Sequence, residues 1–234
     1  IKTVSPEGIE VELRVATMPT AFGEKIVMRI FDPEVLLRDF RDLGFSDDDL
    51  TRWEQMIARA HGIILVTGPT GSGKTTTMRM CAGLLRRARG GVLVDGIDVW
   101  ADPVEARRRV GVVPDPLLLF ERLTGIEQLV HIGLLRNLGR IETETRSRGL
   151  LEVLGLTEAA DEAIGDYSHG MRKKLSLATA LLHRPALLLL DEPFEGVDPV
   201  SAMTVRQVLD RYREAGGTVV VSSHVMEVLQ KVCD

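Results

Sequence analysis

The first sixty residues alternate between apolar and polar positions in a way that predicts strands followed by a helix. Residues 9–17 and 25–31 alternate at every second position around a turn at residues 20–23, which predicts an antiparallel pair. Residues 46–49, Ser-Asp-Asp-Asp, place a carboxylate three residues after a serine, the pattern of a helix start. The predicted helix carries four apolar residues on one face, namely Leu50, Trp53, Met56 and Ile57.

Continuous apolar runs later in the chain predict buried strands. Three of them cover residues 61–67, 187–190 and 218–222. A further strand is predicted at residues 91–96, where Asp-Gly closes it in a turn. Strands of this kind, separated by helical segments, are typical of an α/β domain with a mainly parallel central sheet.

Residues 117–183 are predicted to be mostly helical, with no strand pattern. Thr124 and Glu127 form a capping box for a helix with Leu129, Ile132 and Leu135 on its apolar side. Ser168 is expected to cap a second helix, whose apolar stripe comprises Leu175, Ala178, Leu181 and Leu182. Ser168 and the backbone N–H groups exposed by Gly170 have two interpretations, a second anion site or an ordinary N-cap.

Residues 68–75, Gly-Pro-Thr-Gly-Ser-Gly-Lys-Thr, fit the phosphate-binding loop pattern G-x-x-x-x-G-K-[ST] between a predicted strand and a predicted helix. Glycines let successive N–H groups approach phosphate oxygens. Lys74 is expected to contact the β- and γ-phosphates and the Thr75 hydroxyl to ligate Mg²⁺. The predicted nucleotide-binding residues of this segment are Gly68, Pro69, Thr70, Gly71, Ser72, Gly73, Lys74, Thr75 and Thr76.

Two later strands end in residues suited to ATP hydrolysis. The run at residues 187–190 is followed by Asp191, a candidate for the Mg²⁺ hydration shell, and Glu192, a candidate general base for the attacking water. The run at residues 218–222 is followed by His224, placed to reach the γ-phosphate. The parallel sheet would bring these side chains to the edge where α/β folds bind ligands.

Composition excludes several classes of protein. The 234 residues contain 29 Lys and Arg against 34 Asp and Glu, a formal net charge of −5, so we expect no nucleic-acid partner. The basic runs 107–109 and 172–174 are interpreted as solvated faces or anion contacts. Two distant cysteines favour a reducing compartment. No apolar run approaches the roughly 18 residues of a membrane span, so we expect a cytoplasmic protein without direct membrane insertion. A start at Ile1 suggests a fragment.

From about Met78 onward the chain resembles the nucleotide-binding domain of an ABC transporter, closest to drug-exporter subunits. Lys74 and Thr75 match Walker A and residues 187–191 match Walker B. Glu192 matches the catalytic glutamate, residues 195–199 the D-loop, His224 the switch histidine, and residues 167–171 the signature motif. The resemblance implies two domains around two ATP molecules, in which Ser168 and Gly170 contact the γ-phosphate held by the partner. It also implies a membrane permease as partner and a peripheral location at the inner face of the membrane.

The chain departs from that family at two motifs. In the signature, His169 and Met171 stand where the family has glycine and glutamine. At the position of the Q-loop glutamine the chain has Asp115, a carboxylate expected to contact a metal-bound water and to add negative charge near the γ-phosphate.

Residues 1 to about 77 are similar instead to type II secretion and type IV pilus assembly ATPases. The similarity lies in residues 14–29, 43–45 and 61–75, and it runs through the phosphate-binding loop. The acidic box, the histidine box and the Walker B of that family do not follow. The chain is therefore interpreted as a hybrid joined at the loop. No aromatic residue is assigned to stack on adenine; Phe22 and Phe31 are the nearest candidates.

The sequence thus predicts an α/β P-loop NTPase with an antiparallel N-terminal strand pair and a helical insertion. We expect a secretion-ATPase-like segment at residues 1–60 and an ATPase domain at residues 61–234, with the helical subdomain at about 117–183. The leading hypothesis is the homodimeric Mg-ATP-hydrolysing subunit of an ABC exporter. The alternatives are a hexameric secretion or pilus assembly motor, and a hybrid that binds ATP with little turnover.

Overall fold

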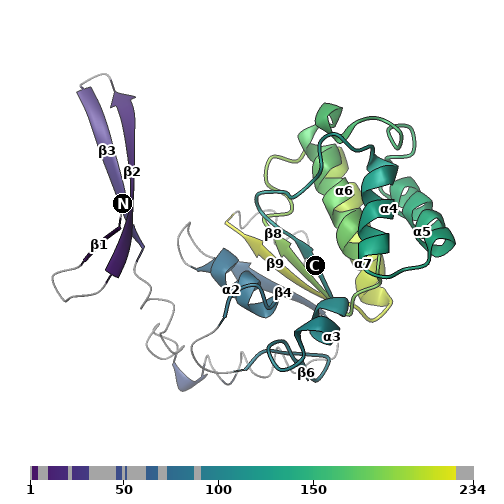
Figure 1. Ribbon diagram of the computed structural model, residues 1–234, viewed down its shortest axis with the longest axis horizontal. Helices are drawn as coiled ribbons and strands as arrows, with labels where there is room; N and C mark the ends of the chain where they lie inside the picture. The colour runs from purple at the N-terminus through teal and green to yellow at the C-terminus, as the bar shows by residue number, and fades with distance from the viewer. Residues whose placement is uncertain are drawn as a thin grey trace. The chain divides into compact units, whose positions relative to one another are not determined.

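The computed structural model describes residues 2–4, 10–20, 23–31, 46–48, 51, 62–67, 73–86 and 91–224. The chain divides into two compact units (Figure 1). The first comprises Ile1–Glu54 with Arg87–Gly91, and the second comprises Gln55–Arg86 with Val92–Asp234.

The first unit contains a three-stranded antiparallel sheet. Its strands are β1 (Lys2–Val4), β2 (Glu10–Thr20) and β3 (Gly23–Phe31), in the order β1-β2-β3. Thr20 pairs with Gly23 at the turn, so the predicted antiparallel pair is confirmed. A helix begins at Asp47, as the serine–carboxylate pattern predicts, and Thr51 Oγ1 donates to the Asp47 carbonyl at 2.8 Å. The apolar face predicted for this helix lies outside the described residues.

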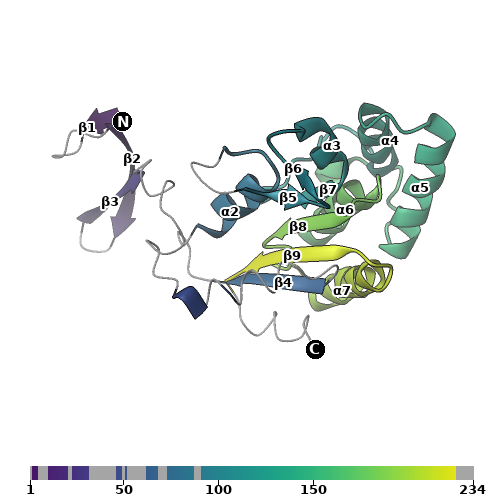
Figure 2. The same ribbon diagram turned by 90° about the horizontal axis from the view of Figure 1, so that it is seen from below.

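The second unit is built on a four-stranded parallel sheet. Its strands are β4 (Gly62–Thr67), β7 (Val110–Val113), β8 (Leu187–Asp191) and β9 (Thr218–Ser223), in the order β4-β9-β8-β7 (Figure 2). The three predicted apolar runs are strands β4, β8 and β9. Because every pairing is parallel, the four carboxyl ends lie at one edge of the sheet.

Residues 91–96 form part of a small hairpin rather than one strand. Strand β5 (Leu93–Val94) pairs antiparallel with β6 (Ile97–Asp98). Asp95 and Gly96, the predicted turn, both have positive φ, 51° and 77°. Such a turn joins two short strands, which is why the segment reverses direction.

Six α-helices and one 3₁₀ helix complete the described part of the second unit. They are α2 (Lys74–Cys81), α3 (Pro103–Arg108), α4 (Gly125–Leu135), α5 (Arg140–Val153), the 3₁₀ helix η2 (Ile164–Asp166), α6 (His169–Leu181) and α7 (Pro199–Glu214). The predicted helical insertion corresponds to α4, α5 and α6. The capping box at Thr124 is confirmed: its Oγ1 accepts from Glu127 N at 3.2 Å, and Glu127 Oε2 accepts from Thr124 N at 2.9 Å.

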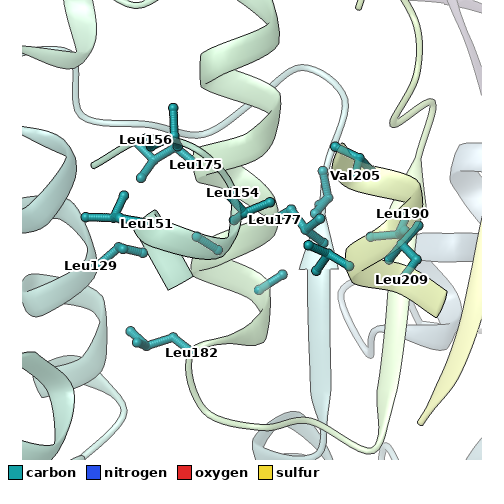
Figure 3. Close-up of a cluster of buried hydrophobic side chains, with 14 of the residues drawn as sticks. Leu129, Leu151, Leu154, Leu156, Leu175, Leu177, Leu182, Leu190, Val205 and Leu209 are labelled. Carbon is teal, nitrogen blue, oxygen red and sulfur yellow. The ribbon is translucent and has the colours of Figure 1, made fainter. Parts of the chain in front are cut away.

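The parallel sheet separates two apolar clusters, because successive strand residues point to opposite faces. On β8, Leu188 and Leu190 join the larger cluster with helices α4 to α7 (Figure 3), whereas Leu189 joins the smaller cluster with α2, α3 and the β5-β6 hairpin. Helix α6 approaches β7 closely at Gly111, where an added Cβ would collide with the Ala180 carbonyl oxygen. The domain therefore has three layers with helices on both faces of the sheet.

One sequence interpretation is wrong, and one of the two alternatives offered for the basic run at residues 172–174 is excluded. Leu135, placed on the apolar side of α4, is 66% exposed because α4 ends there and its buried face is set by Leu129. The basic run at residues 172–174 is not a solvated face: Lys173 is 3% exposed and Lys174 is 9% exposed, since α6 runs through the core. Among the described residues, no helix has the length and apolar character that crossing a bilayer requires.

Candidate functional site

The site lies at the carboxyl edge of the parallel sheet, where all four strands end. Thr67 ends β4, Val113 ends β7 two residues before Asp115, Asp191 ends β8, and Ser223 ends β9 just before His224. The sheet topology therefore gathers the predicted site residues from segments far apart in sequence.

The phosphate-binding loop enters helix α2 through Gly73. Residues 68–72, five of the predicted nucleotide-binding residues, lie outside the described part of the chain. Gly73 has a φ of 89°, which glycine alone adopts without a steric penalty, and its carbonyl accepts from Thr77 N at 2.8 Å. Lys74, Thr75 and Thr76 form the first turn of α2, and α2 contacts β8. Lys74 is 9% exposed and thus held at the sheet edge.

Glu192 connects Lys74 with His224. Its Oε1 lies 4.0 Å from Lys74 Nζ, and its Oε2 lies 3.1 Å from His224 Nδ1. The His224 backbone N–H also donates to Oε2 at 3.3 Å. The Glu192 side chain is only 12% exposed. Lys74 and His224, both predicted to act on the phosphates, therefore lie against the two carboxylate oxygens of Glu192, the predicted general base.

Ser222 fixes the two acids at the end of β8 to each other. Its Oγ donates to Asp191 Oδ1 at 2.5 Å and accepts from the Glu192 backbone N–H at 3.1 Å. Ser222 is fully buried and Asp191 is 5% exposed. Glu192 has a φ of 46°, a region that residues other than glycine seldom adopt, so its backbone bonds hold it in an unusual conformation.

The N-terminus of α6 carries the signature residues. Ser168 caps the helix by accepting from Met171 N at 3.2 Å. Gly170 is buried, and a Cβ there would lie 2.9 Å from Asp198 Oδ2 and from Ser201 Oγ at the start of α7. The side chain of His169, which replaces a family glycine, turns to the D-loop, with its Nε2 3.1 Å from the Glu195 carbonyl oxygen. Hydrogen bonds from Ser201 lower the pKa of Asp198 below its usual value.

Two contacts at the site were not foreseen from the sequence. Ser222 faces Asp191 across the β8-β9 pairing, a register that no local pattern reveals. Lys173 donates from Nζ to the Glu192 carbonyl at 2.8 Å and lies 3.6 Å from Asp115 Oδ1. The sequence carried a signal for Lys173, since it precedes Leu177, a further apolar residue that α6 buries, by four residues and so lies on the same side of the helix.

Ligand atoms of Glu192, Glu195 and His224 lie within 4.8 Å of one another. Glu195 and His224 are exposed, and both Glu192 and His224 belong to the site already described. The Mg²⁺ ligands predicted from the sequence are different residues. Asp191 and Thr75 supply oxygen atoms, the donor type that Mg²⁺ prefers, from β8 and from the helix that packs on it.

Two family models match the chain. Residues 2–109 match the model described as type II/IV secretion system protein. Residues 103–229 match the model described as AAA domain, putative AbiEii toxin, Type IV TA system. The kinds and order of the two matches agree with the two resemblances seen in the sequence, but the matches meet at residues 103–109 rather than at the phosphate-binding loop.

Relatives of both kinds are found among curated proteins. The ABC transporter ATP-binding protein NatA of Bacillus subtilis is 36% identical over 173 residues, 74% of this chain and 70% of NatA. The linearmycin resistance ATP-binding protein LnrL of the same organism is 36% identical over 167 residues, 71% of this chain and 54% of LnrL. The type IV pilus assembly ATPase TfpB of Acinetobacter baylyi is 63% identical over 78 residues, 33% of this chain and 13% of TfpB.

A solved structure described as the ATP-binding subunit of an ABC transporter is 28% identical. It matches with a TM-score of 0.67 over 75% of this chain and 73% of its own. The fold is thus that of an α/β P-loop ATP-binding protein. The chain belongs to the ATP-binding proteins of ABC transporters, and through residues 103–229 to the AAA-domain family whose model it matches. It spans about half the length of most curated transporter relatives that it matches.

Proposed function

We propose that the chain binds Mg-ATP and hydrolyses it. The observation that carries this proposal is the convergence of Lys74 and His224 on the two carboxylate oxygens of Glu192. A cation for phosphates, a candidate base and a histidine at the same strand edge are the groups that phosphoryl transfer to water requires. The loop at residues 68–73 supplies the remaining phosphate contacts in this proposal.

Each residue has a distinct role in the proposed reaction. Glu192 orients the attacking water and accepts its proton, while His224 holds the Glu192 carboxylate in place from the end of β9. Lys74 neutralises charge on the β- and γ-phosphates. Asp191 and Thr75 would hold Mg²⁺, which neutralises phosphate charge when bound. Asp115 is the proposed contact to water bound at the metal.

The proposed assembly is a homodimer. Ser168 and Gly170 then present the N-terminus of α6 to the γ-phosphate held by the partner, since a helix N-terminus favours anions. The supporting observation is that Ser168 is exposed while Gly170 is packed tightly against α7, which fixes the direction of the helix start. This arrangement would complete each ATP site with groups from two protomers.

The proposed setting is an exporter at the inner face of the cell membrane. LnrL is by name a resistance protein for linearmycin, which supports a role in export. In this proposal the helical insertion of α4 to α6 docks on a membrane permease, and the permease selects the substrate. The protein itself would be cytoplasmic and peripheral.

A second candidate is a secretion or pilus assembly motor. Its supporting observation is the 63% identity to TfpB. The acid and histidine groups that surround the candidate base, however, come from residues 191–224, which lie within the match to the AAA-domain model. A hybrid that binds ATP with little turnover is the third candidate.

Native mass measurement with and without Mg-ATP separates the first two candidates. The ABC proposal expects two protomers in the presence of ATP. Six protomers would support the motor and would contradict the exporter proposal. A chain that binds ATP but stays a monomer, without releasing phosphate, would support the third candidate.

A further inference from the structure

Lys173 is a buried lysine at the edge of the candidate site. It is 3% exposed and lies in the second turn of α6. Lysine is almost never buried to this extent unless its ammonium group is paired, because an uncompensated charge is costly to remove from water. The partners of Lys173 therefore indicate what it does.

The ammonium group joins the segments that follow two different strands. Its Nζ donates to the Glu192 carbonyl oxygen at 2.8 Å, just after β8. The same Nζ lies 3.6 Å from Asp115 Oδ1, two residues after β7. The Asp115 side chain is 45% exposed, so its carboxylate is the counter-charge on the solvent side of the lysine. Lys173 thus links α6 to both strand ends.

The bond to Glu192 matters because the backbone there is unusual. With a φ of 46°, Glu192 occupies the left-handed region, which a residue with a side chain leaves unless neighbouring groups hold it. Ser222 accepts from its N–H at 3.1 Å, and Lys173 donates to its carbonyl. Both polar groups of the Glu192 backbone are therefore bonded, and the direction of its side chain follows from them.

We propose that Lys173 is a positioning residue that holds the Glu192 backbone in this conformation while Asp115 compensates its charge. This inference rests on the proposed role of Glu192 in hydrolysis. Lys173 does not contact the nucleotide in this account. Its loss therefore lowers turnover without weakening ATP binding.

The first experiment separates turnover from binding. In K173Q the charge-assisted bond is lost, and kcat falls about tenfold or more, the fold-change that corresponds to a hydrogen bond involving a charged group. The dissociation constant of a fluorescent ATP analogue stays within about twofold of the parent, since no phosphate contact is removed. The matched control is K174Q, at the next residue of α6, also buried at 9% exposure and outside the site. Equal kcat values for K173Q and K174Q would overturn the proposal.

The second experiment tests the pairing with Asp115. D115N, at a half-exposed side chain, lowers kcat by about twofold to fivefold, the range for a screened ion pair. In D115N/K173Q no charge is left uncompensated, so the double variant loses less than the product of the two single losses. Losses that multiply would contradict the pairing. Because Asp115 also has the proposed contact to water at the metal, D115N alone is judged by its urea midpoint. If K173Q does not fold, a D115N midpoint equal to that of the parent would overturn the proposal.

The urea midpoints of the parent, both single variants and the double variant provide a readout that does not need turnover. The pairing predicts that the two shifts in midpoint are not additive, and additive shifts would contradict it. If the parent chain releases no phosphate, the proposed hydrolysis is wrong. The four urea midpoints would still test the pairing of Lys173 with Asp115.

Discussion

Replacing Ser222 by alanine removes the hydroxyl that joins the two acids of the site. Ser222 is fully buried in β9, where its Oγ donates to Asp191 at 2.5 Å and accepts from Glu192 N at 3.1 Å. Alanine fits the same space and keeps the backbone pairing of β9 with β8. The substitution therefore changes two hydrogen bonds and little else.

The expected cost follows from those two bonds. A hydrogen bond to a charged group contributes about 1.5–3 kcal/mol, and a buried N–H left without a partner costs about 1–3 kcal/mol. Asp191 is 5% exposed, so water has little access to replace the hydroxyl. The free energy of unfolding should fall by about 2.5–6 kcal/mol, a large part of the roughly 5–15 kcal/mol typical of a domain.

Urea unfolding followed by circular dichroism measures this loss, and the chain offers a matched control. Ser147 is also fully buried, but within the part of the chain that the structure describes its Oγ has no hydrogen-bond partner. Ser147→Ala deletes the same atom and should change stability by less than about 0.5 kcal/mol, or raise it slightly. Equal losses in the two variants would refute the role assigned to the Ser222 hydroxyl.

Three further predictions address binding and pH. Lys74→Ala should abolish binding of fluorescent ATP because it removes the cation proposed for the β- and γ-phosphates, whereas Arg79→Ala, exposed on the same helix, should bind as the parent does. The phosphate groups are common to ATP and GTP, and an absent aromatic stacking partner costs about 0.5–1.5 kcal/mol. Calorimetry should thus show a preference for ATP over GTP below about tenfold. A hundredfold preference would contradict the inference that no aromatic residue stacks on adenine. Burial, with positive charge from Arg136 and Arg146, lowers the pKa of His183 from 6.5 to about 4. Between these two pH values His183 is therefore protonated in the unfolded chain and neutral in the folded chain. Stability should fall by about 1.4 kcal/mol for each pH unit between 6.5 and 4, and His183→Gln should flatten that slope in urea unfolding; an unchanged slope would contradict the assignment.

The elements that the sequence predicted correctly are those with a local signal. Strands β4, β8 and β9 are continuous apolar runs, and the Thr124 capping box places all its groups within four residues. The cap at Ser168 is local in the same way. Local hydrogen bonds and burial on both faces are sufficient to define such elements without knowledge of the fold.

The contacts that the sequence did not predict join residues far apart in the chain. Ser222 lies 31 residues from Asp191, and Lys173 lies 19 residues from Glu192. Both contacts depend on the strand order and on the path of α6 through the core, which periodicity does not specify. The same reason explains why the solvated-face alternative fails at Lys173, since a basic run looks solvated until its helix is known to be buried.

The most direct test of the account compares phosphate release from Mg-ATP by the parent chain and by Glu192→Gln. Glutamine keeps the shape of Glu192 but cannot accept a proton, so release should fall by roughly 10²–10⁴-fold while ATP binding persists and an ATP-held dimer accumulates. Phosphate release by the variant at the rate of the parent would contradict the assignment of Glu192 as the base and, with it, the proposed mechanism of hydrolysis.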